Sequence, residues 1–440
     1  MKTLEKSINY YCIFVVATAS FSGFLFGYYT AIISGALALI SPSFQLTLGK
    51  ESAFVSVLLL GAILGCFLGG YLTDRMGRKK VFLLTCFLWT LGCLILIMAS
   101  SYPTLIVARI VHGISIGIVS VLVPLYLGEI SSAVYRGRIV SIYQLMMTLG
   151  ILVAYFINYK LTPTGNWKMM FLMGLWPVFL QLICLCFIPE SPLWLFRKNK
   201  ILLATESLKK LKLPASSFES PKQKSFKVSH KTISFLLLIG GVLGAVQQLT
   251  GINTIIYYAP RIFQHAGYSS HSDALLATIL LGITNFVGSF ISVWLLDYVG
   301  RRKLLLVGIF GMMMSLICLS VFSIYSTAST GWVSIAALIS YMFFFSIGPG
   351  PVTWVLLSEI YPPQIRDKAM TISLITNWVC VYLVLWTFPY LLEWIEIPGT
   401  FGIYSFISLI SFLFILKFIP ETKQKSLEDI AEIFEERNNK

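Results

Sequence analysis

One stretch of this sequence reads Gln247-Gln248-Leu249-Thr250-Gly251-Ile252-Asn253 and lies inside an apolar segment that begins near Ile233. Amide side chains are costly in hydrocarbon unless they face a cavity or a partner helix. On a regular helix the three amides point in separate directions, at about 100° per residue. They converge only if the helix unwinds near Thr250 and Gly251, as glycine permits. A broken helix lining a polar cavity is typical of a transporter site, whereas the alternative is hydrogen bonding between membrane helices.

The composition is typical of a membrane protein. Of the 440 residues, 57% are hydrophobic and 12% are charged, and the mean hydropathy is +0.82. Spans of about 20 apolar residues explain such values. The net charge is +14, but the basic residues lie in short loops between apolar runs, which fits membrane topology and argues against a nucleic-acid partner. The eight cysteines lie in apolar segments without disulfide or metal spacing, so we interpret them as packing residues.

Twelve apolar segments form two sets of six. They lie near 10–40, 52–73, 81–100, 104–130, 138–159, 167–188, 233–259, 273–296, 304–325, 331–357, 369–392 and 400–419. The first is interpreted as a retained helix and not as a signal peptide, because it has no small-residue cleavage site. The longest polar gap separates the two sets and includes an amphipathic helix expected at 201–212. The sequence therefore predicts an all-α membrane protein with twelve transmembrane helices in two six-helix bundles.

We expect four parts along the chain. An N-terminal bundle occupies 1–188, a linker with short helices 189–232, a C-terminal bundle 233–420 and a tail 421–440. Basic residues concentrate after the even-numbered segments, as at Arg78-Lys79-Lys80, and in the linker. The positive-inside rule therefore predicts that the linker and both termini are cytoplasmic.

Three charged motifs occur once in each half. Asp74-Arg75-Met76-Gly77-Arg78 recurs as Asp297-Tyr298-Val299-Gly300-Arg301, and Pro189-Glu190-Ser191 recurs as Pro420-Glu421-Thr422. Glu129, seven residues before Arg136, recurs as Glu359 before Arg366. This repetition indicates two related bundles with a site at their interface.

These charged residues lie at predicted cytoplasmic helix ends. The candidate gate consists of Asp74, Arg78, Glu129, Arg136, Glu190, Asp297, Arg301, Glu359, Arg366 and Glu421. Bidentate ion pairs among them would close the cytoplasmic face in one conformation and break when it opens. The alternative is that they only set topology and cap helices, since exposed ion pairs contribute little.

With these motifs the chain resembles the sugar porter family of the major facilitator superfamily, which includes facilitative glucose transporters and bacterial proton–sugar symporters. Further matching residues are Gly27-Tyr28, Ile33-Ser34-Gly35, Pro124-Leu125-Tyr126-Leu127-Gly128-Glu129, Gly348-Pro349-Gly350-Pro351-Val352-Thr353-Trp354 and Asn377-Trp378. The resemblance covers nearly the whole chain. The run at 348–351 is expected to break its span and to let it bend as a gate.

The resemblance implies a central sugar site. By motif it falls on Gln144, Gln247, Gln248, Asn253, Asn285, Trp354, Asn377 and Trp378. The chemistry fits, because sugar hydroxyls and amides both donate and accept hydrogen bonds, and sugar C–H faces stack on aromatic rings. For Gln144, Asn285 and Asn377 the alternative is interhelical hydrogen bonding, and Trp378 is equally explained by packing or interface anchoring.

The chain departs from the proton-coupled members at one position. Their motif reads Gly-Tyr-Asp, whereas this chain has Gly27-Tyr28-Tyr29, so the proton-carrying carboxylate is missing. Tyrosine, with a pKa near 10, is a poor proton carrier, which favours uniport. Arg109 remains, and His112 lies three residues further on as an alternative titrating group, although a neighbouring cation opposes its protonation. Its other interpretation is polar packing. Leu193 also replaces an expected arginine, which removes one cytoplasmic ion-pair partner.

These observations predict alternating-access transport of a hexose or pentose, either by uniport or by proton symport through another group. We expect a multi-pass protein of the plasma membrane, or of the inner membrane in a bacterium, that works as a monomer in the lipid bilayer. No phosphate-binding loop is visible, so neither ATP nor another cofactor is expected. The rivals are a sugar sensor, for which the tail after Pro420 offers little room, an antiporter for another organic solute, and an enzyme, for which no nucleophile–base pair or metal set is visible.

Overall fold

The structure, a computed structural model, describes residues 10–131, 136–213, 230–265, 270–324, 330–362, 365–423 and 433–434. The regular structure in these ranges is helical. The first bundle contains α1 (Tyr10–Ala31), α2 (Ile33–Ser43), α3 (Leu48–Met76), α4 (Arg78–Ile97), α5 (Tyr102–Glu129), α6 (Arg136–Leu161), the 3₁₀ helix η1 (Thr162–Thr164), α7 (Trp167–Leu172) and α8 (Leu175–Phe187). Two short helices follow it, α9 (Pro192–Arg197) and α10 (Ile201–Leu211). The amphipathic helix expected at 201–212 is therefore present as α10.

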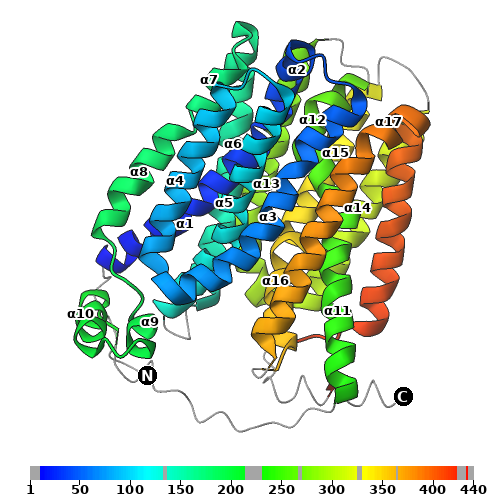
Figure 1. Ribbon diagram of the computed structural model, residues 1–440. Coiled ribbons are helices and arrows are strands. Elements are labelled where there is room, and N and C mark those ends of the chain that lie inside the picture. The colour runs from blue at the N-terminus through cyan, green and yellow to red at the C-terminus, as the bar shows by residue number, and fades with distance from the viewer. Residues whose placement is uncertain are drawn as a thin grey trace.

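The second bundle follows the linker. It contains α11 (His230–Leu249), α12 (Ile252–His265), α13 (His271–Val299), α14 (Arg301–Phe322), α15 (Thr330–Ile347), α16 (Pro349–Ile360) and α17 (Arg366–Phe418). The two bundles stand side by side, and α9 and α10 lie at the end opposite α2 and α12 (Figure 1). Between the bundles, α3 packs against α17 and α6 packs against α13.

Eleven helical segments within the described ranges are long and apolar enough to cross a membrane. One of them, Lys368–Phe418, has 51 residues, which at 1.5 Å per residue is about 77 Å and more than twice a bilayer's hydrocarbon core. Its backbone leaves helical geometry at Glu396, where φ is 55°, and Pro398 follows. This kink divides α17 into two crossings, so the prediction of twelve membrane-spanning helices in two bundles is confirmed.

Two breaks in the second bundle were predicted and are present. The helix that carries the amides ends at Leu249 and resumes as α12 at Ile252, with Gly251 at a φ of 93°. A Cβ atom at Gly251 would lie 2.7 Å from the Tyr404 ring, so glycine is required there for space as well as for conformation. Gly348 separates α15 from α16, which begins at Pro349. Both breaks lie next to the amide side chains.

Close helix packing in the first bundle relies on small residues. A Cβ atom at Gly113 of α5 would lie 1.9 Å from the backbone oxygen of Leu58 in α3. Backbones approach this closely in membrane bundles because van der Waals packing, and not water exclusion, drives helix association there. The contact fixes α5, which carries three of the candidate functional residues.

Candidate functional site

Gln247 is the centre of a hydrogen-bonded chain of amides. Its Nε2 donates to the backbone oxygens of Pro349 at 3.0 Å and Gly350 at 2.9 Å. Its Oε1 accepts from Nε2 of Gln248 at 3.3 Å and from Nδ2 of Asn377 at 3.0 Å. Gln247 therefore joins α11 to α16 and α17, and it satisfies backbone carbonyls at the α15–α16 break.

The helix break brings a further amide into this chain. Nδ2 of Asn253, the second residue of α12, donates to Oε1 of Gln248 across the break. Asn377 also donates to the backbone oxygen of Gly244 at 3.0 Å. Gln247, Gln248, Asn253 and Asn377 thus form one connected group, and the expected convergence of the three amides near Gly251 is observed.

The other predicted site residues lie on α6, α13, α16 and α17. Asn285 of α13 is buried and accepts a hydrogen bond from Oγ of Ser346 at 2.9 Å. Trp354 of α16 and Gln144 of α6 are half-buried. Trp378 is buried, with its ring centre 6.0 Å from that of Phe26 in the first bundle. The described bonds connect Asn285 to α15 and leave it outside the four-amide chain.

Two buried tyrosines that sequence reasoning missed support the break. The hydroxyl of Tyr341 in α15 donates to the backbone oxygen of Thr250 at 3.0 Å, a carbonyl freed where the helix unwinds. The hydroxyl of Tyr155 in α6 donates to the backbone oxygen of Ile256 at 2.9 Å, which ties α12 to the first bundle. A buried tyrosine needs a hydrogen-bond partner, but the amino-acid sequence does not show which group that partner is.

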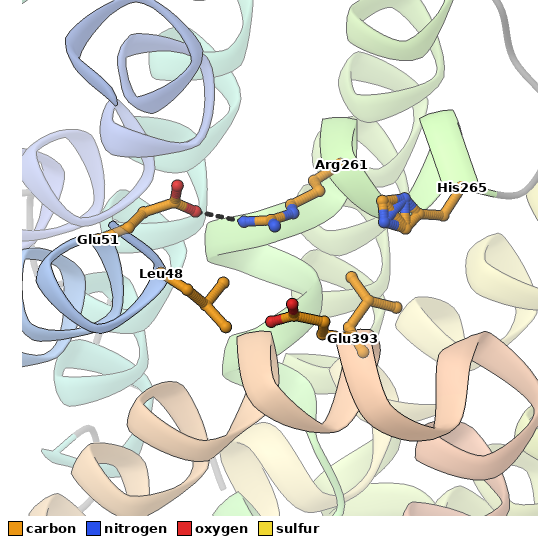
Figure 2. Close-up of a pocket in the computed structure, with 6 residues that line it drawn as sticks. Leu48, Glu51, Arg261, His265 and Glu393 are labelled. Atoms are coloured by element: carbon orange, nitrogen blue, oxygen red, sulfur yellow. Dashed lines mark hydrogen bonds and ion pairs between the residues drawn. The ribbon is translucent and has the colours of Figure 1, made fainter. Parts of the chain in front are cut away.

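The end of the molecule near α2 and α12 holds an ion pair between the bundles. Arg261 of α12 contacts Glu51 of α3, and Figure 2 shows the two side chains pointing toward each other. Oγ of Ser41 donates to the other oxygen of Glu51 at 3.1 Å. Glu51 and Arg261 line a cavity of about 360 Å³ together with Leu48, His265, Leu392 and Glu393. Nearby, Oγ of Ser52 donates to the backbone oxygen of Trp386 at 2.5 Å.

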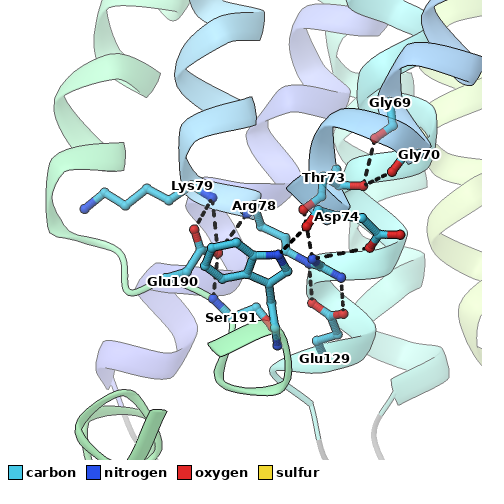
Figure 3. A network of polar contacts seen from close by, with 10 residues as sticks. Gly69, Gly70, Thr73, Asp74, Arg78, Lys79, Glu129, Glu190 and Ser191 are labelled. Carbon is cyan, nitrogen blue, oxygen red and sulfur yellow. Dashed lines mark hydrogen bonds and ion pairs between the residues drawn. The ribbon is translucent and has the colours of Figure 1, made fainter. Parts of the chain in front are cut away.

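At the opposite end, the first charged motif forms a buried network (Figure 3). The guanidinium of Arg78 binds Glu129 through two parallel bonds of 2.8 and 2.6 Å, and Asp74 lies 3.8 Å away. Glu190 accepts backbone N–H groups of Arg78 at 2.8 Å and of Lys79 at 3.2 Å, so it caps the first turn of α4. Burial raises the pKa of the Glu190 carboxyl, while these N–H groups and the charge of Arg78 oppose the shift.

The second half repeats this arrangement. Nε of Arg301 donates to Glu359 at 3.0 Å, and Glu421 accepts the backbone N–H groups of Arg301 at 2.9 Å and Arg302 at 3.2 Å. Arg366 donates to the backbone oxygen of Tyr361 at 3.2 Å.

The side chains of Arg136 and Asp297 lie outside the described residues. The ion pairs described at this end join helices of one bundle, as Arg78–Glu129 and Arg301–Glu359 do. Closure of one bundle against the other through these charges therefore stays a prediction.

The three candidate coupling residues lie in the core of the first bundle. The Tyr29 ring stacks on those of Trp89 at 4.7 Å and His112 at 4.6 Å between ring centres. Nη1 of Arg109 donates to the backbone oxygen of Tyr29 at 3.3 Å, and its guanidinium lies 5.7 Å from the Phe54 ring centre. Among the described residues, Nε and Nη2 of Arg109 and both ring nitrogens of His112 have no hydrogen-bond partner.

The fold and these sites define a membrane carrier built from two bundles, with a buried amide group between polar networks at either end. The family described as "Sugar (and other) transporter" matches residues 15–434, and the chain belongs to this family. It is a multi-pass integral membrane protein.

Three relatives show how extensive the similarity is. The chain is 35% identical to the probable metabolite transport protein CsbC of Bacillus subtilis (strain 168), over 99% of this chain and 97% of that protein. It is 36% identical to the arabinose-proton symporter of Escherichia coli (strain K12), over 95% and 92%. A solved structure of the xylose transporter XylE from E. coli, in a partially occluded inward open conformation, matches with a TM-score of 0.84 and 30% identity over 95% of this chain and all of that one.

Proposed function

We propose that the protein transports a monosaccharide across the plasma membrane by alternating access, with Gln247, Gln248, Asn253 and Asn377 binding its hydroxyl groups. The observation that carries the proposal is the amide chain at the α11–α12 break. Each amide offers both donors and an acceptor, which is the pattern that a neutral polyol needs. Gln144, Asn285, Trp354 and Trp378 complete the proposed site. Relatives named for arabinose and xylose support this class of substrate.

The proposed cycle moves residues 1–188 against 233–420, with the linker 189–232, the tail 421–440 and both termini on the cytoplasmic side. In the state described here the bonds of Glu51–Arg261 and Ser52–Trp386 hold the bundles together at the outer end, and Tyr155–Ile256 joins them beside the helix break. The likeness to a XylE structure in a partially occluded inward open conformation supports an inward-facing assignment. Cytoplasmic closure by the ten gate residues belongs to the opposite, outward-facing state.

Two modes of transport remain candidates. Tyr29 occupies the position of the missing carboxylate and favours uniport. The arabinose-proton symporter among the relatives favours proton symport, and the unpartnered ring nitrogens of His112 beside Arg109 offer a titratable group for it. Glucose, xylose and arabinose uptake into proteoliposomes, with and without an inward proton gradient, separates the modes. Uptake that only equilibrates establishes uniport, whereas accumulation that an uncoupler abolishes establishes symport.

The amide site has its own test. Gln248→Ala removes a side chain whose described bonds are made to Gln247 and Asn253, so we expect a rise of tenfold or more in KM with the fold retained. Gln181→Ala is the matched control, because Gln181 is a buried amide of α8 bonded to Ser22 in the first bundle. We expect Gln181→Ala to leave KM unchanged. Equal KM effects in the two variants would contradict the assignment of the site, and no uptake of any of the three sugars would contradict the substrate class.

A further inference from the structure

A second cavity lies on the outer surface of the second bundle, between α14, α15 and the second crossing of α17. It has a volume of about 840 Å³. Its lining is mostly apolar and includes Val307, Phe310, Met314, Ala336, Phe344 and Phe412. Val307, Phe310 and Met314 are each about half exposed, at 52%, 49% and 48%. Because these residues belong to membrane-crossing helices, the groove opens toward lipid.

The dimensions of the groove suit one hydrocarbon chain. Its lining on α14 runs from Leu306 to Cys318. Twelve residues at 1.5 Å each give about 18 Å, comparable to one half of a hydrocarbon core of about 30 Å. The groove therefore follows one leaflet, beginning within about two turns of the N-terminus of α14.

The hydroxyl groups on the floor of the groove already have hydrogen-bond partners, so an occupant does not have to supply any. Ser315 Oγ donates to the backbone oxygen of Gly311 at 2.8 Å and lies 3.0 Å from Ser340 Oγ, so the hydroxyls facing each other between α14 and α15 are partnered. A Cβ atom at Gly311 would lie 2.2 Å from the Phe344 ring, which shows that Phe344 packs directly onto α14. An apolar chain fills such a surface without leaving a buried polar group unsatisfied.

Positive charge gathers at the linker end of the same groove. Lys303 is exposed and lies four residues before Val307, so both are on one face of α14. Nη2 of Arg302 donates to the backbone oxygen of Leu416 at 2.7 Å, which places Arg302 beside Lys417 at the end of α17. The nearby carboxylate of Glu421 accepts the N–H groups of Arg301 and Arg302 and caps α14.

We propose that this groove binds an anionic phospholipid, with one acyl chain between α14 and α15 and the phosphate at Lys303 and Lys417. The two observations are independent, because the apolar groove suits a hydrocarbon chain, whereas the cations suit an anionic headgroup. The lipid comes from the leaflet on the linker side. Its chain lies against Phe344, four residues before the Gly348 break, and so braces the C-terminal end of α15.

The first experiment measures thermal stability of delipidated protein in detergent with added dioleoyl phosphatidylglycerol or dioleoyl phosphatidylcholine. We expect phosphatidylglycerol to raise Tm more than phosphatidylcholine does, and Lys303→Gln to abolish at least half of that difference. Lys80→Gln is the matched control, because Lys80 is the exposed lysine at the corresponding place in α4. An equal response to the two lipids in the unmodified protein, or equal losses in Lys303→Gln and Lys80→Gln, would overturn the proposal.

A second variant tests the groove itself. Ala336 of α15 lines the groove and is exposed, so Ala336→Phe occupies the space without overpacking the core. Native mass spectrometry of the protein in phosphatidylglycerol-containing micelles should count one tightly held lipid fewer for this variant. Retention of the same lipid number in a folded Ala336→Phe protein would show that the chain lies elsewhere.

Discussion

At the end of the molecule that carries α2 and α12, an ion pair and a hydrogen bond join one bundle to the other, whereas the ion pairs described between helices at the linker end stay inside one bundle. In this state, therefore, the charged groups at one end connect the two bundles, whereas those at the other end stabilise each bundle separately. The outer contacts are those that must break for the bundles to exchange sides. In the proposed cycle the pairs of Arg78 and Arg301 at the linker end stabilise each bundle, since both partners move together.

The largest effect is expected at the linker end, from Arg78→Leu. Arg78 and Glu129 are 0% and 5% exposed, so removing the guanidinium leaves a buried carboxylate without its partner, at a cost of about 3–5 kcal/mol. Arg301→Leu is the comparison, because Arg301 and Glu359 are 17% and 24% exposed and water screens the charge that is left. Chemical unfolding in detergent should show the greater loss for Arg78→Leu, and equal losses would contradict the difference in burial.

A substitution at the α11–α12 break should have nearly as large an effect on stability. Gly251→Ala places a Cβ atom in a backbone conformation that costs about 1–3 kcal/mol, and the Tyr404 ring must also move. Because α11 and α12 meet there, we expect a loss of transport along with a lower Tm. Gly241→Ala is the control, since its Cβ atom would have no neighbour nearer than 4.0 Å. A normal transport rate in Gly251→Ala would mean that the break needs no glycine.

A smaller effect is expected from Glu51→Gln at the outer end. The pair is partly exposed, so its loss should shift the balance between states by about 1 kcal/mol, or roughly fivefold, toward the outward-facing state. The measurement is the labelling rate, from outside, of a single cysteine at position 56 in a cysteine-free background. Exchanging the charges, as Glu51→Arg with Arg261→Glu, should restore the original rate. Labelling that is faster in the double variant than in Glu51→Gln would argue against an ion pair between bundles.

The smallest effect should come from Ser52→Ala, which removes one hydrogen bond to Trp386 at the outer end. A single neutral hydrogen bond contributes about 0.5–1.5 kcal/mol, and we expect the low end of this range because the lost hydroxyl is short and uncharged. The same labelling assay should show a change of threefold or less. Ser43→Ala is the control in the same assay, because the hydroxyl of Ser43 bonds within α2 at the same end of the molecule. A Ser52 effect larger than that of Glu51→Gln would reverse the order of the outer contacts.

Much of the fold could be predicted because hydrophobic length and repeated motifs are properties of the sequence itself. The break at Gly251 was also predictable, since adjacent amides in an apolar segment demand a local explanation. The boundary between the last two crossings was also predictable, since the kink at Glu396 lies in the gap expected between 392 and 400, but the sequence does not show that α17 passes through it as a kink and without a loop. A connection this short carries no turn signal that distinguishes a kink from a loop.

The outer ion pair could not be predicted from the residues. Glu51 lies at the start of an apolar span, where an acidic residue is explained by the helix dipole alone. Arg261 lies on another helix of the other half, and neither residue belongs to a repeated motif. Only the fold, which places Glu51 of α3 and Arg261 of α12 at the same end of the molecule, brings them together. The hydrogen bond of Tyr341 could not be predicted either, because its partner is the backbone oxygen of Thr250, which is free to accept only where the helix breaks.

The four-amide chain lies entirely in the second bundle, on α11, α12 and α17. A recombination event within 214–229 would therefore transfer the whole set of amides between two carriers in a single step. The first half would contribute Gln144 to the proposed site, and the second half would contribute the four-amide chain with Asn285, Trp354 and Trp378. Chimeras joined in that segment should take their sugar preference from the parent of the C-terminal half, which makes new specificity in such carriers a matter of exchanging halves as much as of altering single side chains.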